Sequence, residues 1–241
     1  EIPTNCILSK RIPGCGATTL ELETDRNSII VVPNVPVIVS KCNKFPNLLG
    51  VYEKVSLHQI IQYLTNNTTH KIMTTPESFE KVKSACERCG INMFSHFFLL
   101  MDECHQLVKD TDYRVDISLP MVDFFKFNHK ALVSATPIEF NDPRFIENQF
   151  EIIEIAADYD YRQDITVTRT YNIAKAVSEY LESHNGTICF FVNSVVEIYS
   201  IMKHFGIMED SAVYCAPKSR SKLKNEYGFT NAHTEWSAET M

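Results

Sequence analysis

One short stretch, residues 97–105, limits the folds open to this chain more than any other. It reads F-F-L-L-M-D-E-C-H, so five apolar residues lead directly into two adjacent carboxylates. An uninterrupted apolar run of this length is typical of a strand buried on both faces, as in a parallel sheet. Open α/β sheets place their chemistry at the carboxyl ends of such strands. We therefore expect Asp102 and Glu103 at the rim of a sheet, where carboxylates can hold Mg²⁺ and position a water molecule. The alternative is an apolar strand followed by an ordinary polar turn.

The rest of the first two thirds of the chain repeats this alternation of apolar runs and amphipathic segments. Strands are predicted at residues 6–10, 29–33, 48–52, 71–75 and 131–133, and helices at 35–43, 57–64, 77–89 and about 116–127. Ser56 is a suitable N-cap for the second of these helices. Strands that alternate with helices predict an α/β fold, in which a parallel sheet is covered by helices on both faces.

Composition places the chain among ordinary globular proteins. The 241 residues, 44% hydrophobic and 22% charged, suffice for one large domain or two modest ones. No apolar run approaches the roughly 20 residues that span a bilayer, so we expect no membrane partner and a cytoplasmic location. Because the sequence starts at Glu1 and not at Met, we expect a processed product or a fragment.

The net charge of −7 argues weakly against a strong nucleic-acid binder. The densest basic run, Lys218 to Lys224, is more simply interpreted as a solvated face than as a nucleic-acid contact. The eight cysteines are scattered, as reduced and buried thiols are. Cys86 and Cys89 form the one close pair, but a zinc site needs four ligands and no second pair follows. Their segment instead suits a helix that Gly90 closes.

Residues 11–19, R-I-P-G-C-G-A-T-T, combine two closely spaced glycines with two hydroxyls and then a helix-like segment. Glycines let the backbone bend so that several N–H groups face one anion, which is how a phosphate-binding turn works. The usual form ends Gly-Lys-Ser/Thr, whereas here Gly16 is followed by Ala17. Taken alone, the segment fits an ordinary glycine turn at least as well.

The order of these motifs resembles the first RecA-like domain of superfamily-two helicases of the DExD/H-box type. I-P-G-C-G-A-T-T is similar to the phosphate loop, I-I-V-V-P to the segment that follows it, T-T-P-E-S to a loop that touches nucleic-acid backbone, D-E-C-H to the DExH box and S-A-T-P to the coupling motif. Each short string is a weak match, but the five occur in one order, each at a predicted strand end. The resemblance covers residues 6 to about 155.

The resemblance implies a role for each matching residue. Asp102 would hold Mg²⁺ together with the hydroxyl of Thr18, Glu103 would position or deprotonate the attacking water, and His105 would link the nucleotide site to the coupling motif. The implied nucleotide-binding residues are Pro13, Gly14, Cys15, Gly16, Ala17, Thr18 and Thr19; the coupling residues are Ser134, Ala135 and Thr136; the nucleic-acid contacts are Pro33, Thr75, Pro76 and Glu77.

The resemblance also implies a domain organisation. Residues 1–157 would form the ATP-binding RecA-like domain, residues 158–165 a polar linker, and residues 166–241 a partial second RecA-like domain. In the last part, strands are predicted at 165–170, 187–192 and 211–215, and helices at 172–184 and from the cap at Ser194 to Phe205. No threonine-glycine-aspartate segment or arginine-finger motif occurs before Met241, so this domain is abridged or the sequence stops inside it.

Two departures from the family pattern bear on activity. Ala17 removes the ammonium that would contact the β- and γ-phosphates, a loss of roughly 1.5–3 kcal/mol, or on the order of 10- to 150-fold in affinity. Lys10 or Arg11 folding back onto the phosphates is an alternative source of that charge. The missing arginine finger removes a factor of roughly 10³–10⁵ where it applies. We therefore expect the chain by itself to be a poor ATPase.

Three hypotheses follow from the sequence. The first and favoured one is a helicase-like, nucleic-acid-dependent ATPase that uses ATP and Mg²⁺ and acts on DNA or RNA. The second is a non-catalytic helicase-like module that binds nucleic acid or a protein partner. The third is a nucleotide-binding α/β protein that acts on something other than nucleic acid.

Overall fold

The computed structural model describes residues 1–11, 14–105, 119–136, 142–156, 158, 167 and 169–234. The chain divides into two compact units, Glu1–Arg162 and Gln163–Met241, which are taken separately below. Nearly all of the predicted linker lies outside the described residues. None of the described helices is long and apolar enough to cross a membrane.

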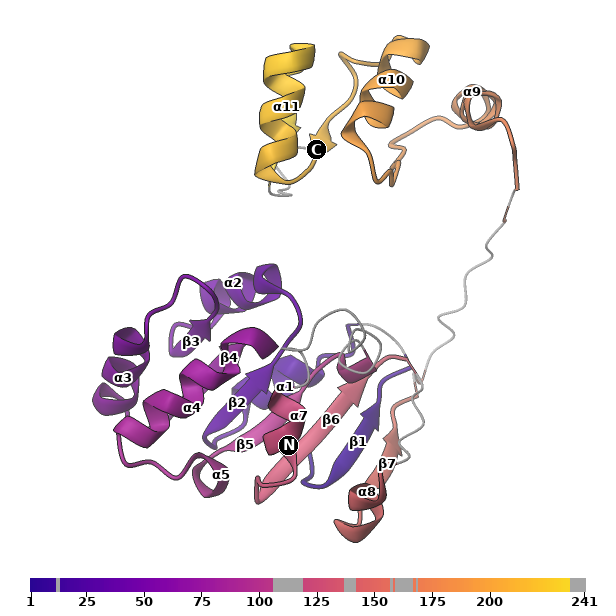
Figure 1. Ribbon diagram of the computed structural model, residues 1–241. Coiled ribbons are helices and arrows are strands. Elements are labelled where there is room, and N and C mark those ends of the chain that lie inside the picture. The colour runs from indigo at the N-terminus through magenta and orange to yellow at the C-terminus, as the bar shows by residue number, and fades with distance from the viewer. Residues whose placement is uncertain are drawn as a thin grey trace. The chain divides into compact units, whose positions relative to one another are not determined.

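A seven-stranded sheet in which every pairing is parallel forms the centre of the first unit (Figure 1). Its strands stand in the order β3-β4-β2-β5-β6-β1-β7. Their bounds are β1 Cys6–Ser9, β2 Ser28–Val31, β3 Leu48–Val51, β4 Lys71–Thr74, β5 Phe98–Met101, β6 His129–Ser134 and β7 Glu151–Glu154. The predicted α/β class is confirmed, and the apolar run that ends in Asp102 is the middle strand.

The longer helices of the first unit agree with the sequence patterns, whereas the short helices α5 and α8 were not predicted. Their bounds are α1 Ala17–Glu23, α2 Val35–Lys44, α3 Leu57–Asn66, α4 Phe79–Arg88, α5 Met93–His96, α7 Leu119–Phe124 and α8 Pro143–Glu147, with a 3₁₀ turn at Pro76–Ser78. The predicted cap of α3 is confirmed: Ser56 accepts from the Gln59 N–H, and the Gln59 side chain accepts from the Ser56 N–H. Residues 116–118 of the helix predicted at about 116–127 lie outside the described residues.

The core of this unit has two layers, one on each face of the sheet. Alternate residues of a strand point to opposite faces. Leu99 and Met101 of β5 accordingly pack in one layer with residues of α3, α4 and α7, whereas Phe98 and Leu100 pack in the other with residues of α1 and α2. Burial on both sides explains why the strand is uninterrupted in its apolar character.

The second unit, Gln163–Met241, contains three helices and one short sheet in its described part. The helices are α9 Ile173–Ser183, α10 Val195–Phe205 and α11 Pro217–Tyr227, and β8 Val213–Tyr214 pairs in parallel with β9 Ala232–His233. Ser194 caps α10 by accepting from the Glu197 N–H, as predicted. The basic run 218–224 lies on α11, which buries Leu223 and exposes most of its remaining surface.

The strand predicted at residues 187–192 is wrong. This segment forms no strand, and the side chain of Phe191 is 98% exposed. The apolar pattern identified residues that favour burial, but a buried strand also needs a neighbour on each side. The described strands of this unit, two residues each, pair with one another. Half of the strand predicted at 165–170 lies outside the described residues, and the other half, Val167, Arg169 and Thr170, is not in a strand.

Close packing between α2 and β3 generates a test of the fold. A Cβ at Gly50 would lie 2.6 Å from Ile38 Cγ2 and 2.9 Å from Cys42 Sγ. Gly50→Ala should therefore lower the free energy of unfolding of the first unit by about 1–3 kcal/mol, through overpacking. Hydrogen exchange of the β3 amides would measure the loss. In the matched cycle, Ile38→Ala should offset part of it, so that the double variant loses less than the sum of the single losses. Strict additivity would contradict this packing.

Candidate nucleotide site

Several polar side chains predicted from the sequence meet where β1, β5 and β6 end. These strands are parallel, with Ser9 opposite Ser134 and Met101 opposite Leu132, so their carboxyl ends share one edge of the sheet. The side chains that meet there belong to Lys10, Thr18, Asp102, Glu103, His105 and Ser134. Five of the six are residues to which the sequence motifs assign a role.

Asp102 is the centre of this cluster. Its side chain is 8% exposed and both of its carboxylate oxygens are in use. Oδ1 accepts from Lys10 Nζ at 2.8 Å and from the Glu103 backbone N–H at 2.9 Å, and Oδ2 accepts from the hydroxyl of Thr18. The two groups predicted to share a magnesium ion, Asp102 and Thr18, are therefore in direct contact.

Lys10 joins the two adjacent carboxylates. Its Nζ lies 2.8 Å from Asp102 Oδ1 and 2.8 Å from Glu103 Oε1, and its side chain is 7% exposed. Burial by itself lowers the pKa of Lys10, but Asp102 and Glu103 outweigh burial and the net pKa is raised. The ammonium is accordingly charged at neutral pH. Arg11, the other cation considered from the sequence, instead reaches Glu154 at 2.8 and 2.9 Å.

Glu103 connects the cluster to His105 and Ser134. Its φ of +53° is unusual for a residue with a side chain and indicates local strain at the strand end. His105 Nδ1 lies 3.4 Å from Glu103 Oε2 and 3.0 Å from Ser134 Oγ. Ser134 Oγ donates to the Thr136 carbonyl at 2.8 Å and accepts from the Thr136 N–H at 3.0 Å. The hydroxyl of Ser134 therefore contacts both the His105 ring and the backbone of Thr136.

Residues of the predicted DExH box and coupling motif are thus linked by polar contacts in the first unit. The path runs from Glu103 through His105 to Ser134 and on to the backbone of Thr136. Ala135 lies between the last two and is half-buried. A change at Glu103 can therefore reach the end of β6 through polar contacts.

The glycine turn has the backbone that its sequence suggests. Gly14 and Gly16 have φ values of +79° and +89°, a region that residues with a Cβ rarely adopt. Cys15 between them is exposed, and Ala17 begins α1 with its methyl group buried. Pro13 lies outside the described residues. The turn leads directly to Thr18, so its backbone and the carboxylate cluster form one continuous site.

Thr19 is placed differently from its neighbour. Its hydroxyl accepts from Lys41 Nζ of α2 at 2.6 Å, which ties α1 to α2 on one face of the sheet. Thr18 is therefore the hydroxyl of this pair that belongs to the carboxylate cluster, and the contact made by Thr19 is between helices.

The four residues predicted to contact nucleic acid follow β2 and β4, beyond β5 along the same edge. Thr75 and Pro76 are buried, Pro33 is half-buried and Glu77 is exposed. An exposed carboxylate repels phosphate. Contacts to a nucleic-acid backbone at this place would therefore come from main-chain groups more than from these side chains.

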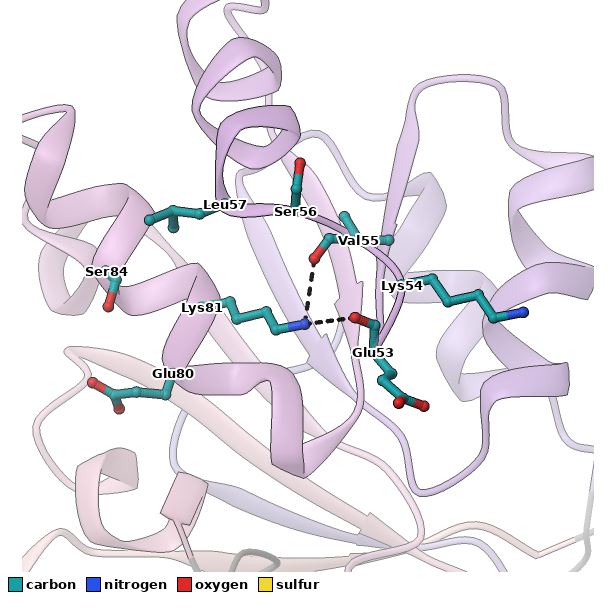
Figure 2. Close-up of a pocket in the computed structure, with 8 residues that line it drawn as sticks. All are labelled: Glu53, Lys54, Val55, Ser56, Leu57, Glu80, Lys81 and Ser84. Carbon is teal, nitrogen blue, oxygen red and sulfur yellow. Dashed lines mark hydrogen bonds between the residues drawn. The ribbon is translucent and has the colours of Figure 1, made fainter.

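A surface hollow of about 490 Å³ lies farther along this edge, between the segment after β3 and α4. Figure 2 shows Lys81 crossing it from α4, and its Nζ donates to the carbonyls of Glu53 at 2.9 Å and Val55 at 3.3 Å. Two glutamates and two lysines line the hollow, so their charges balance. None of its lining residues belongs to the Asp102 cluster. No sequence pattern predicts this hollow, because the lysine and the carbonyls come from separate segments.

The donors around Asp102 fit magnesium better than a metal that demands many protein ligands. Within the described ranges, no group of three or more His, Cys, Asp and Glu side chains is arranged to hold a metal ion. Mg²⁺ commonly takes one or two carboxylates and completes its shell with water and substrate phosphates. Asp102 and the Thr18 hydroxyl match that pattern. Cys86 is a poor candidate ligand, because burial raises the pKa of its thiol to about 12.

Comparisons with known proteins identify no family for this sequence. No protein-family model and no curated protein matches it. Among solved structures, the chain is similar to the Hef helicase domain of Pyrococcus furiosus (11% identity, TM-score 0.41), to a DEAD box protein of Methanococcus jannaschii (13%, 0.46) and to a hypothetical ATP-dependent RNA helicase of Sulfolobus tokodaii (15%, 0.45). Each match covers 95% of this chain, which spans 54%, 68% and 72% of the respective structures.

Two cysteines of this site, Cys15 and Cys104, should differ in how fast their thiols are alkylated. Cys104 is 1% exposed, and burial, with the nearby carboxylates, raises its thiol pKa to about 12. At pH 8 about one molecule in 10⁴ then carries the thiolate that reacts. Iodoacetamide should alkylate the exposed Cys15 at least 100-fold faster than Cys104, measured by peptide mass spectrometry. Exposed Cys189 serves as the reference thiol, and comparable rates at Cys104 and Cys189 would contradict the burial described here.

Proposed function

We propose that the chain is a helicase-like, nucleic-acid-dependent ATPase of the superfamily-two DExH type, with ATP and Mg²⁺ as cofactors and DNA or RNA as partner. The observation that carries the proposal is the convergence on Asp102 of Thr18 and Lys10, beside the path from Glu103 to Ser134. Residues 1–157 would be the ATP-binding RecA-like domain, 158–165 the linker and 166–241 part of a second RecA-like domain.

Each residue of the site would then have a defined task. The backbone amides of Gly14, Cys15 and Gly16 would bind phosphate oxygens, and Asp102 with Thr18 would hold Mg²⁺. A bound Mg²⁺ supplies charge neutralisation at the phosphates. Glu103 would orient the attacking water and accept its proton.

The second half of the proposed cycle is the link from nucleotide to nucleic acid. His105 is hydrogen-bonded to Ser134 at the end of β6, so a movement of Glu103 on nucleotide binding would be transmitted to residues 134–136. Main-chain groups after β2 and β4 would contact the nucleic acid. Coupling of this kind predicts that nucleic acid alters turnover.

A non-catalytic helicase-like module is the second candidate, and one observation favours it. Lys10 occupies both carboxylates in the structure, and Ala17 supplies no charge to the phosphates. A site held in this state would bind nucleic acid or a protein partner without hydrolysing ATP. The third hypothesis, a nucleotide-binding protein unrelated to nucleic acid, predicts turnover or binding that nucleic acid leaves unchanged.

Turnover measurements separate the three candidates. Mg²⁺-ATP hydrolysis by the whole chain should be slow and should rise when single-stranded or duplex nucleic acid is added. Glu103→Gln should lower it by roughly 10²–10⁴-fold, because the variant cannot accept a proton from water. Glu53→Gln, at the neighbouring hollow, is the matched control and should retain activity. Binding of nucleic acid without turnover in the unaltered chain would favour the non-catalytic module.

Protection of a single thiol tests nucleotide binding without any turnover. Cys15 lies between the two glycines whose amides would bind phosphate and is exposed, as is Cys189 of the other unit. Mg²⁺ with a non-hydrolysed ATP analogue should slow alkylation of Cys15 at least tenfold and leave Cys189 unchanged. Equal labelling of Cys15 with and without the analogue, at concentrations up to the millimolar range, would contradict a phosphate site at this turn.

A further inference from the structure

The buried ammonium of Lys10 contacts two carboxylates, and the glycine turn begins four residues after Lys10 in the chain. We propose that Lys10 is an exchangeable counter-ion: it bridges Asp102 and Glu103 while the site holds no metal, and it transfers to the phosphates of the nucleotide once a divalent cation occupies those carboxylates. This inference rests on the proposed function of the site as a Mg²⁺-nucleotide site and names the residue that replaces the absent loop lysine.

A metal at Asp102 would compete with Lys10 for this carboxylate. A cation held between Asp102 Oδ2 and the Thr18 hydroxyl would face, across the same carboxylate, an ammonium that lies 2.8 Å from Oδ1. Two positive charges that share one buried carboxylate repel each other. Lys10 and the metal therefore compete for the carboxylates, and the ammonium needs a new anionic partner when the metal wins.

The summed charges of the site indicate which anion this new partner of Lys10 would be. Lys10, Asp102 and Glu103 together carry a net charge of −1. Adding a divalent cation changes the sum to +1, which suits a polyphosphate anion and not a neutral ligand. The phosphates would arrive at the amides of Gly14 and Gly16, which are joined to Lys10 by a short length of chain. A lysine is suited to such an exchange, since its ammonium sits on a flexible stem with three donors.

The residues near Lys10 in the chain do not place a positive charge at these carboxylates. Ala17, where the family pattern has its lysine, carries a buried methyl group. Arg11 extends to Glu154, the last residue of β7, and is exposed. The structure thus separates the two cations that the sequence could not distinguish, and it places Lys10 at the carboxylates.

Two binding measurements on the whole chain test the exchange, and neither requires turnover. Lys10→Met keeps most of the length of the unbranched side chain and removes its charge. Without nucleotide, Mn²⁺ followed by electron paramagnetic resonance should bind at least tenfold more tightly to Lys10→Met, because its competitor is gone. A fluorescent, non-hydrolysed ATP analogue with saturating Mn²⁺ should bind on the order of 10- to 150-fold more weakly. Arg11→Met is the matched control and should change neither affinity.

Opposite shifts of the two affinities are the signature of exchange. Lys10→Arg retains the charge and should stay closer to the unaltered chain in both measurements, and it keeps the test available if Lys10→Met does not fold by circular dichroism. Weaker Mn²⁺ binding in Lys10→Met, or unchanged nucleotide binding, would overturn the inference and leave Lys10 as a fixed structural ion pair. No nucleotide binding by the unaltered chain would instead overturn the proposed function, and the inference with it.

Discussion

A buried carboxylate at the end of the middle strand governs how this edge of the protein is built. An ionised group removed from water needs charged and hydrogen-bonding partners, and loss of one partner from a buried pair costs roughly 3–5 kcal/mol. Asp102 obtains its partners from two distant segments, Lys10 after β1 and Thr18 of α1, and from the next N–H along the chain. The requirement to satisfy one carboxylate therefore fixes the end of β1, the start of α1 and the turn after β5 relative to one another.

The parallel sheet divides its carboxyl edge into two parts, one on each side of β5. Because every pairing in the sheet is parallel, the loops that follow the strands all emerge on one side. β6 and β1 lie to one side of β5, and β2 and β4 lie to the other. The nucleotide residues of the proposal fall on the first side and the predicted nucleic-acid contacts on the second, so the turn at residues 102–105 stands between them. A residue pair such as Glu103 and His105 is well placed to respond to both.

The strands buried on both faces could be predicted from the sequence, because burial alone requires a continuous apolar run. β1 to β6 all lie where such runs occur. β7, Glu151–Glu154, was not predicted, because it is an edge strand with a glutamate at each end. α5 and α8 were not predicted, because they are too short to show a helical period. At residues 187–192 the error was the opposite one, because a strand was predicted where none forms. Their apolar pattern is real, but strand formation depends on partners that a local pattern does not describe.

Prediction of the candidate site from the sequence has the same limit for single side chains. Asp102, Glu103, His105, Thr18 and Ser134 converge as the motifs implied, since each motif fixes its residues next to the end of a strand. The cation could not be chosen in this way, because Lys10 and Arg11 are adjacent and chemically similar. Consecutive residues of an extended chain point to opposite sides. Which of them meets the carboxylates depends on partners 92 and 143 residues away, Asp102 and Glu154. The absence of a lysine after Gly16 is therefore a local feature of the sequence, whereas the choice between Lys10 and Arg11 is a property of the folded sheet.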